Sequence, residues 1–385
     1  MVLIASLLLI QAAAQPPVDQ DLSAADSTII VRGSSLADSQ AALDRCKAQH
    51  CSPDREIYAA ITVASKQFVD GDYAGARHTL LASRSRNARY DARYPKPVSD
   101  LHRALVQMSR LDGRPFSARV STFDATDALR APTAPDDQAV MFQRLETGHQ
   151  LAAESNIPDA IRLYDDVAAD ARQRGFDRVE AQAMFDAAAL YASAASVDFQ
   201  YRGAARRRAM LIEKRQEPAF QAVKDGLVLL KAKLAVLTMP MDKRSAYLAA
   251  ATLPKVDDAI LLSEPFPKYV ETTAGLSGST SDFPEWGDVA FWVRPDGSVS
   301  APRLIGQSAQ VPGPWLGVKI KSVSERRYAP LRRPAGDPGL YVVERYSMVH
   351  NIQSKTGSAL MQRDVNGMLV TTDITLAHKG PVGMM

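Results

Sequence analysis

The spacing of apolar residues changes character along the chain. From Ser35 to about Pro254 the sequence is rich in alanine, and apolar residues recur every three or four positions, the period of a helix buried on one side. Beyond about residue 285, short runs of β-branched and aromatic residues alternate with turn-forming residues, which indicates strands. Runs of helices followed by runs of strands are typical of α+β proteins. We therefore expect an α+β multidomain chain, with an all-α front and a small α+β domain behind it.

Two segments of the helical part share one pattern of small and large residues. Each has a small residue, then Ala twelve positions later, then a large apolar residue four positions further on. The matching residues are Ala64, Ala76 and Leu80 in one segment and Gly148, Ala160 and Tyr164 in the other. Antiparallel helices approach closely only where both carry small side chains, and a polar turn such as Asp70-Gly71-Asp72 can join them. The pattern therefore predicts stacked helical hairpins over residues 35–258.

This pattern resembles the tetratricopeptide repeat, whose small, small and large positions correspond to those six residues. Both copies depart from the family at the aromatic position four residues before the first small residue, where this chain has Ala60 and Arg144. A third helical pair is expected over Arg178–Arg215, and residues 217–237 are expected to cap the array. The resemblance implies a solenoid with a concave groove that binds extended peptides or helices.

The strand-rich part contains a defined order of elements. We expect, in sequence, a strand over Asp288–Val293, a turn at Pro295–Gly297, a strand over Val299–Ile305, a helix over Pro314–Arg327 and a strand over Leu340–Tyr346. The Pro-Asp-Gly sequence is typical of tight turns. The helix is expected because Leu316, Ile320 and Val323 fall on one face of it.

This order resembles the C-terminal domain of TonB-type energy transducers. The family's turn corresponds to Pro295–Val299 and its aromatic and basic stretch to Arg326–Pro330. The resemblance covers residues 285–350 and implies a small sheet that binds a partner segment at its edge. The implied partner-binding strand consists of Leu340, Tyr341, Val342, Val343, Glu344, Arg345 and Tyr346. Residues 351–385 depart from the family, and we expect a C-terminal β extension there, whose strand around Met368–Leu376 is the alternative binding strand.

A stretch rich in proline, glycine and serine separates the two parts. It includes Ser263–Pro267 and Gly275–Asp282. Such a composition is typical of a connection between domains. We therefore expect a linker over residues 259–284.

The first residues have the order of a secretory signal peptide. An apolar run from Val2 to Ile10 is followed by Ala12-Ala13-Ala14, a typical cleavage site. The run is too short to cross a hydrocarbon core of about 30 Å. We expect a signal peptide over residues 1–14 and a flexible N-terminus over 15–34. Since no Lys or Arg precedes the apolar run, an uncleaved inner-membrane anchor and a buried first helix remain as alternatives.

Cys46 and Cys51 are the two cysteines of the chain. On one continuous helix, residues five apart point about 140° from each other. The thiols therefore meet only if a helix ends near Ala48 and another begins at Ser52-Pro53. We expect a structural disulfide, as in an exported protein. Free buried thiols and a redox pair are the alternatives.

Charge and motifs exclude several functional classes. The net charge of +3 gives no reason to expect a nucleic-acid partner. The histidines lack the paired spacing of metal ligands, and no phosphate-binding glycine motif occurs. The six histidines are His50, His78, His102, His149, His350 and His378. We expect no catalytic residue, no metal and no cofactor.

Together these observations favour an exported, non-catalytic protein of a Gram-negative envelope. We expect it in the periplasm, without a stable membrane span after cleavage, with a protein or peptide bound through the repeat groove and the sheet edge. One alternative is a true TonB-type energy transducer that supports outer-membrane transport, anchored in the inner membrane and facing the periplasm. Another is an enzyme without a recognisable motif.

Overall fold

The structure is a computed structural model. It describes residues 35–130, 138–153, 156–195, 198–237, 239–265, 284–300, 302–309, 314–334, 336–354, 361–363 and 367–378. The expected signal peptide, the expected flexible N-terminus and residues 266–283 of the expected linker lie outside this part. Within it the chain is α+β, with helices first and antiparallel strands after them, as the sequence predicts.

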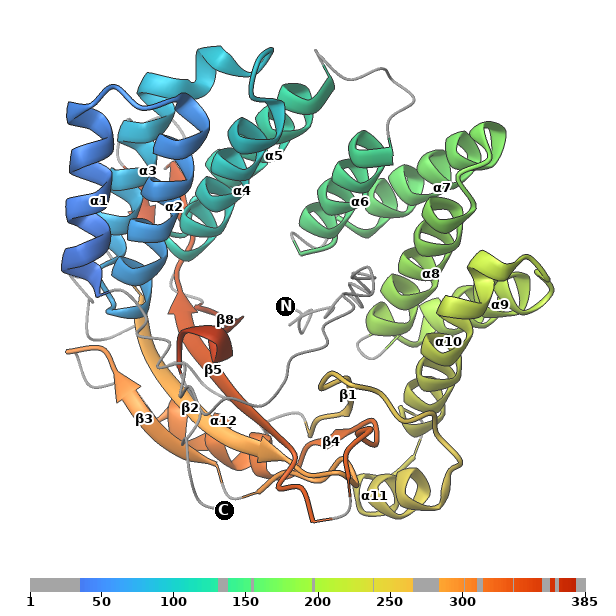
Figure 1. Ribbon diagram of the computed structural model, residues 1–385. Helices are drawn as coiled ribbons and strands as arrows, with labels where there is room; N and C mark the ends of the chain where they lie inside the picture. The colour runs from blue at the N-terminus through green and yellow to red at the C-terminus, as the bar shows by residue number, and fades with distance from the viewer. Residues whose placement is uncertain are drawn as a thin grey trace, which may run out of the picture.

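The helical part is a succession of antiparallel hairpins (Figure 1). The α-helices are α1 (Leu36–Ala48), α2 (Pro53–Val69), α3 (Tyr73–Asn87), α4 (Pro95–Leu111), α5 (Pro115–Arg130), α6 (Gln138–Ala153), α7 (Ile157–Arg174), α8 (Asp177–Ala194), α9 (Arg202–Glu213), α10 (Pro218–Val236) and α11 (Met241–Ala250), with 3-10 turns η1 (Ala88–Tyr90) and η2 (Phe199–Tyr201). Helices α2, α4, α7 and α10 have proline in their first turn. Proline lacks an N–H that would be unpaired there in any case, so these residues fix where the helices begin.

The small residues of the predicted repeats lie where paired helices approach each other. Ala64 of α2 and Ala76 of α3 are buried with Leu80 in one hydrophobic cluster. On α6, a Cβ added to Gly148 would lie 2.4 Å from a ring carbon of Tyr164 on α7. These two hairpins therefore depend on the small side chains that the sequence pattern identifies.

The main sheet is antiparallel and has four strands in the order β3-β2-β5-β8. Its strands are β2 (Glu285–Val293), β3 (Arg303–Gln307), β5 (Leu340–Val349) and β8 (Met368–Asp373). Two smaller ladders join β1 (Leu261–Ser263) to β4 (Arg327–Tyr328) and β6 (Ile352–Ser354) to β7 (Met361–Arg363). Helix α12 (Trp315–Ser324) covers one face of the main sheet, where Leu316 and Val323 pack with Phe291.

The observed strands differ from the predicted ones at their ends. Strand β2 begins earlier, at Glu285, and β5 continues to Val349. The strand after the hairpin turn begins at Arg303, not at Val299, because Pro302 has no N–H to donate to the ladder. The C-terminal strand ends at Asp373 and gives way to the 3-10 turn η4 (Thr375–Ala377). There the Asp373 side chain accepts from the amide of Thr375 at 2.8 Å and closes a turn in place of a further strand residue.

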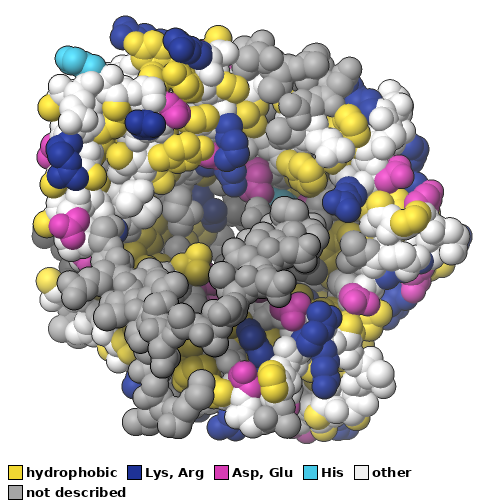
Figure 2. Space-filling model, viewed as in Figure 1, with side chains coloured by type: hydrophobic (Ala, Val, Ile, Leu, Met, Phe, Trp, Pro, Cys, Tyr) yellow, Lys and Arg dark blue, Asp and Glu magenta, His cyan; other side chains and the backbone are white. Residues whose placement is uncertain are grey.

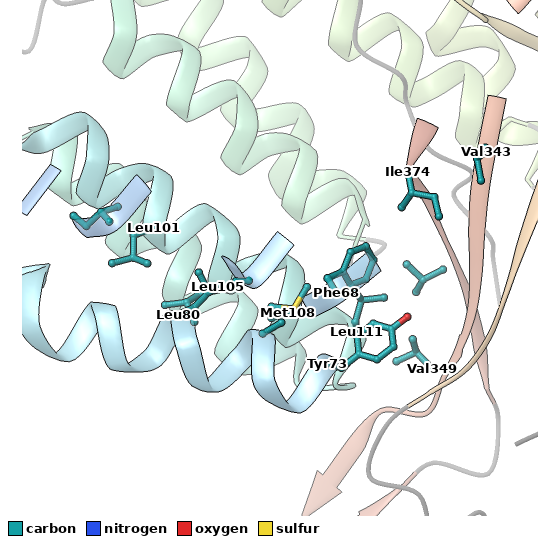
Figure 3. Close-up of a cluster of buried hydrophobic side chains, with 14 of the residues drawn as sticks. Phe68, Tyr73, Leu80, Leu101, Leu105, Met108, Leu111, Val343, Val349 and Ile374 are labelled. Carbon is teal, nitrogen blue, oxygen red and sulfur yellow. The ribbon is translucent and has the colours of Figure 1, made fainter. Parts of the chain in front are cut away.

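The strand-rich part packs against both ends of the helical array, the main sheet at one end and the β1–β4 ladder at the other, so the chain forms a ring (Figure 1). At one end, Val343 and Val349 of β5 join the cluster that contains Leu105 of α4, and Figure 3 shows these side chains together. At the other end, Ala329 packs with Leu229 of α10. The two parts of the chain therefore share hydrophobic clusters at two places.

The first residues of the expected linker belong to this contact. Leu261 and Ser263 of β1 pair with Tyr328 and Arg327 of β4. Leu262 is buried in the cluster formed by α10 and α11. The stretch from 259 to 265 is therefore part of the folded structure and not a free linker.

Candidate functional site

The binding strand predicted from the sequence, Leu340–Tyr346, lies inside the sheet. It forms the first part of β5, which pairs with β2 along Leu340–Met348 and with β8 along Glu344–Val349. The expectation that the whole segment offers a free edge is therefore wrong, because residues 344–346 already have backbone partners on both sides. Only its first residues extend past the end of β8, and even there the Val343 amide donates to the Thr375 hydroxyl at 3.0 Å.

The alternative strand of the sequence analysis, β8, is an outer edge of the sheet. The Ile374 amide donates to the Val343 carbonyl oxygen at 2.9 Å, so the backbone groups of Val343 point toward β8. Backbone N–H and C=O groups point to alternate sides of a strand from one residue to the next. In the β5–β8 register, the groups of every second residue of β8 therefore point away from β5. The outward-pointing N–H and C=O groups belong to Leu369, Thr371 and Asp373, and none of them has a backbone partner among the described residues. This edge provides an open row of donors and acceptors.

Arg345 anchors the neighbouring strand β5 to the helical array. Its side chain is fully buried. Its guanidinium donates to both carboxylate oxygens of Asp288 at 2.7 and 2.8 Å, and to the carbonyl oxygens of Phe68 and Val69 at 2.5 and 2.6 Å. These carbonyls end helix α2, where the helix dipole favours a positive charge. Burial acts to lower the pKa of Arg345, but the Asp288 carboxylate outweighs it and holds that pKa above its ordinary value.

Trp286 and Gly71 complete this anchor. The Arg345 guanidinium carbon lies 3.8 Å from the centroid of the Trp286 ring, a cation–π contact. Gly71, in the turn between α2 and α3, has a φ of +83°, and a Cβ there would lie 2.8 Å from a ring carbon of Trp286. Glycine is needed at this turn both for its backbone conformation and to leave room for the indole ring.

A second hairpin turn contacts the far end of β5. Gly113, between α4 and α5, has a φ of +69°, and a Cβ there would lie 2.2 Å from the carbonyl oxygen of His350. The Ile352 amide donates to the Gly113 carbonyl oxygen at 2.7 Å. The helical array thus holds β5 at two points, and β5 in turn positions the edge strand β8.

The opposite face of β5 is fixed by a buried charge network. Arg326 donates to Glu344 at 2.7 Å and lies 3.2 Å from Glu264, and Lys319 donates to Glu264 at 2.5 Å. The Tyr346 hydroxyl also donates to Glu344. Burial, together with the Glu344 charge, raises the pKa of Tyr346 well above its ordinary value, so the phenol stays protonated. Two positive and two negative side chains balance, which makes their burial tolerable.

The other outer edge of the sheet is β3. It pairs with β2 on one side, and its other side has no strand beside it within the described ranges. Its Leu304 and Ile305 side chains are 41% and 39% exposed. This edge could not be predicted from the sequence, because exposed apolar residues in a short strand give the same pattern as any half-buried strand.

The disulfide expected from the sequence is present. Cys46 and Cys51 are bonded, with their Cα atoms 5.1 Å apart. As predicted, α1 ends at Ala48 and α2 begins at Pro53, so the chain folds back between the two cysteines. The bond joins the first two helices of the array.

The described residues were also compared with the requirements of a metal site and of a membrane-spanning helix. In those ranges no set of three or more His, Cys, Asp and Glu side chains is arranged to hold a metal ion. None of the helices described has the length and apolar character required to cross a bilayer. On the face drawn in Figure 2, basic and acidic side chains are interspersed.

Comparison with known proteins places the chain in no family. Neither a scan against models of known protein families nor a search of curated proteins found a match.

Proposed function

We propose that this protein is a non-catalytic interaction protein that binds an extended peptide segment as a fifth strand on the outer edge of β8. The observation that supports this best is the open backbone row at Leu369, Thr371 and Asp373. An extended segment placed there would form main-chain hydrogen bonds with the outward-pointing groups of β8 and gain selectivity from alternate side chains. In this proposal the tetratricopeptide-like array is the scaffold that supports the TonB-like sheet.

The support of β5 by the array favours binding at this edge. Ordering a flexible strand on association would reduce affinity. The contacts of Arg345 with Asp288, Phe68 and Val69 hold β5 in place before any partner arrives. In the view of Figure 1, β8 lies between β5 and the centre of the ring.

We further propose that the protein acts in the periplasm after removal of a signal peptide. The Cys46–Cys51 disulfide supports this location, since disulfides persist in oxidising compartments and are rare in the cytosol. N-terminal sequencing of the protein from a Gram-negative host should give Gln15 as the first residue. A mature chain that starts at Met1 would instead favour the anchored, energy-transducing alternative.

The binding mode can be tested with a random peptide library displayed on phage and selected against the whole protein. In a peptide bound as an added strand, only alternate N–H groups face β8. N-methylation of that alternate set of backbone amides should therefore abolish binding, whereas N-methylation of the other set should not. Thr371→Pro removes an outward N–H from β8 and should weaken binding by at least about tenfold, or about 1.4 kcal/mol. Leu304→Pro makes the same change on the other edge strand, β3, and should leave affinity unchanged.

Three results would overturn the proposal. The first is a phage selection that yields no binding peptide. The second is equal peptide affinity of the Thr371→Pro variant and the wild type. The third is N-methylation that weakens binding equally at every position of the peptide. Circular dichroism and thermal unfolding of both proline variants verify that the fold is intact. Loss of binding only in Leu304→Pro would move the site to β3 and refute the assignment to β8.

A further inference from the structure

A charged cavity that is open to solvent lies on the helical array, at the end of its first hairpins away from the sheet. Its volume is about 540 Å³, and residues of α3, η1, α4 and α5 line it. Tyr73, at the start of α3, lies against β5, where the Arg345 guanidinium carbon is 5.9 Å from the centroid of its ring. Arg84 of the cavity lies eleven residues further along α3, about 16 Å at 1.5 Å per residue. The cavity is therefore separate from the β8 edge.

The cavity contains a buried histidine that lacks a hydrogen-bond partner. His102 of α4 is 6% exposed, and its Nδ1 atom has no hydrogen bond among the described residues. The closest carboxylate oxygen, Oδ2 of Asp124, lies 3.6 Å away, beyond hydrogen-bond reach. Burial lowers the pKa of His102 below its ordinary value, although Asp124 opposes that effect. The neutral ring thus has one donor and one acceptor, and buried polar atoms of this kind are normally paired.

Charges of both signs surround this histidine. Arg84 and Arg89 contribute guanidinium groups, and Asp91, Asp124 and Asp127 contribute carboxylates. Arg89 donates to the Tyr90 hydroxyl at 3.0 Å. Arg84 has no side-chain hydrogen bond or ion pair with the described part of the chain. A ligand with a single charge would place that charge beside groups of the same sign, whereas a ligand with two opposite charges can satisfy both sets.

We propose that this cavity binds a small zwitterion with a free α-amino and a free α-carboxyl group, a single amino acid or a dipeptide. The ligand's carboxylate pairs with Arg84, whose planar fork of donors suits two carboxylate oxygens. Its ammonium group lies against the carboxylate of Asp124. His102 completes the site with a hydrogen bond to the ligand. The volume falls within the range of natural small-molecule pockets, and the largely polar lining suits a small polar ligand.

Isothermal titration calorimetry of the full-length protein with L-alanyl-L-alanine tests this proposal. We expect saturable binding with a Kd of about 1 mM or tighter. N-acetylated and C-amidated forms of the dipeptide, which each lack one charge, should bind at least about tenfold more weakly. Arg84→Gln and Asp124→Asn should each cause a similar loss. Arg206→Gln, which changes an exposed arginine of α9, is the matched control and should bind as the wild type does.

If the dipeptide does not bind at concentrations several times higher than about 1 mM, the proposal is wrong. Equal binding of the blocked dipeptides, or unchanged affinity of Arg84→Gln, would overturn it as well. Thermal unfolding distinguishes a lost site from a lost fold. Because the Arg84 side chain has no ion pair with the described part of the chain, its variant should unfold at the wild-type temperature. These results are independent of the β8 edge, whose ligand binds through backbone groups and does not need free termini.

Discussion

Arg345 of β5 donates a hydrogen bond to the carbonyl oxygen of Phe68 near the end of α2, across 277 residues of sequence. The same guanidinium pairs with Asp288 on the adjacent strand β2. One side chain therefore joins the first helical hairpin to two strands of the sheet. This contact closes the ring on the side of the molecule where the sheet meets α2.

Replacing Arg345 should destabilise the whole protein. Arg345→Leu leaves the Asp288 carboxylate buried without its partner, and breaking a buried ion pair in this way costs about 3–5 kcal/mol. Urea denaturation should report this loss in the free energy of unfolding. The Arg345→Leu, Asp288→Leu double variant should recover part of it, because no charge is then left unpaired.

The matched control for this prediction is Arg332→Leu. Arg332 pairs with Asp257 at 3.1 Å, and both side chains are more than half exposed. Exposed pairs contribute about 0–1 kcal/mol, so this variant should unfold at nearly the wild-type urea concentration. Equal losses for the Arg345 and Arg332 variants would show that the buried contact does not hold the two parts together.

A second prediction concerns the glycine of the first hairpin turn. Gly71→Ala introduces a Cβ at a positive φ and 2.8 Å from the ring of Trp286. Gly175→Ala makes the same change at a φ of +72° with no atom within 4 Å of the new Cβ. Backbone strain is common to both variants and costs more than about 0.4–1 kcal/mol. The Gly71 variant should lose clearly more stability in denaturant unfolding, and the difference measures the contact with the indole ring.

Comparable losses in the two glycine variants would contradict this account. The Trp286→Leu background provides a further check, since a smaller side chain removes the obstacle. In that background the two glycine substitutions should have similar effects.

The sequence predicted the parts of the fold that depend on local patterns. The helical array follows from apolar periodicity, and the small residues Gly148 and Ala76 lie at helix contacts because their spacing places them there. The Cys46–Cys51 bond could be predicted because both helix ends next to it have local signals. The order of strands could not be predicted, since it depends on which distant segments pair.

The same limit applies to the candidate site. The alternation of apolar residues identified β5 as a strand, but it did not show that β8 occupies one of its sides. Arg345 was assigned to a partner surface and is instead buried within the fold. The sequence does contain one indication of this internal pairing. Glu344 and Arg345 are charged residues in an otherwise apolar strand, and Asp288 is a charged residue in the apolar strand β2. Charged residues in buried strands indicate internal pairs.

The disulfide should contribute modestly to stability. It closes a small loop, and the chain-entropy model gives about 2 kcal/mol for such a loop. Reduction, or the Cys46→Ala, Cys51→Ala double variant, should lower the free energy of unfolding by about that amount. Non-reducing peptide mapping of the protein from the periplasm should find one peptide that contains both cysteines. Two freely alkylated thiols would contradict the exported location.

A pH dependence should arise from His149 on α6. Its Nε2 atom lies 3.0 Å from the buried carboxylate of Asp186 on α8. Burial by itself lowers the pKa of His149, but the hydrogen bond to Asp186 and the negative charges of Asp186 and Glu146 outweigh it and raise that pKa from 6.5 to about 9. A histidine pKa that is higher in the folded state stabilises the protein fully below pH 6.5, and this contribution disappears as the pH rises through about 9.

The size of the effect follows from the shift. The rise of the pKa from 6.5 to about 9 corresponds to at most about 3.4 kcal/mol. Urea denaturation at pH 6 and at pH 9.5 should therefore show a drop of up to that size in the wild type, beyond the drop in His149→Gln. Glutamine can still donate to Asp186 but does not titrate, so it keeps the hydrogen bond while it removes the proton linkage. If the two proteins lose stability in parallel between these pH values, His149 is not held as a cation by Asp186 and Glu146.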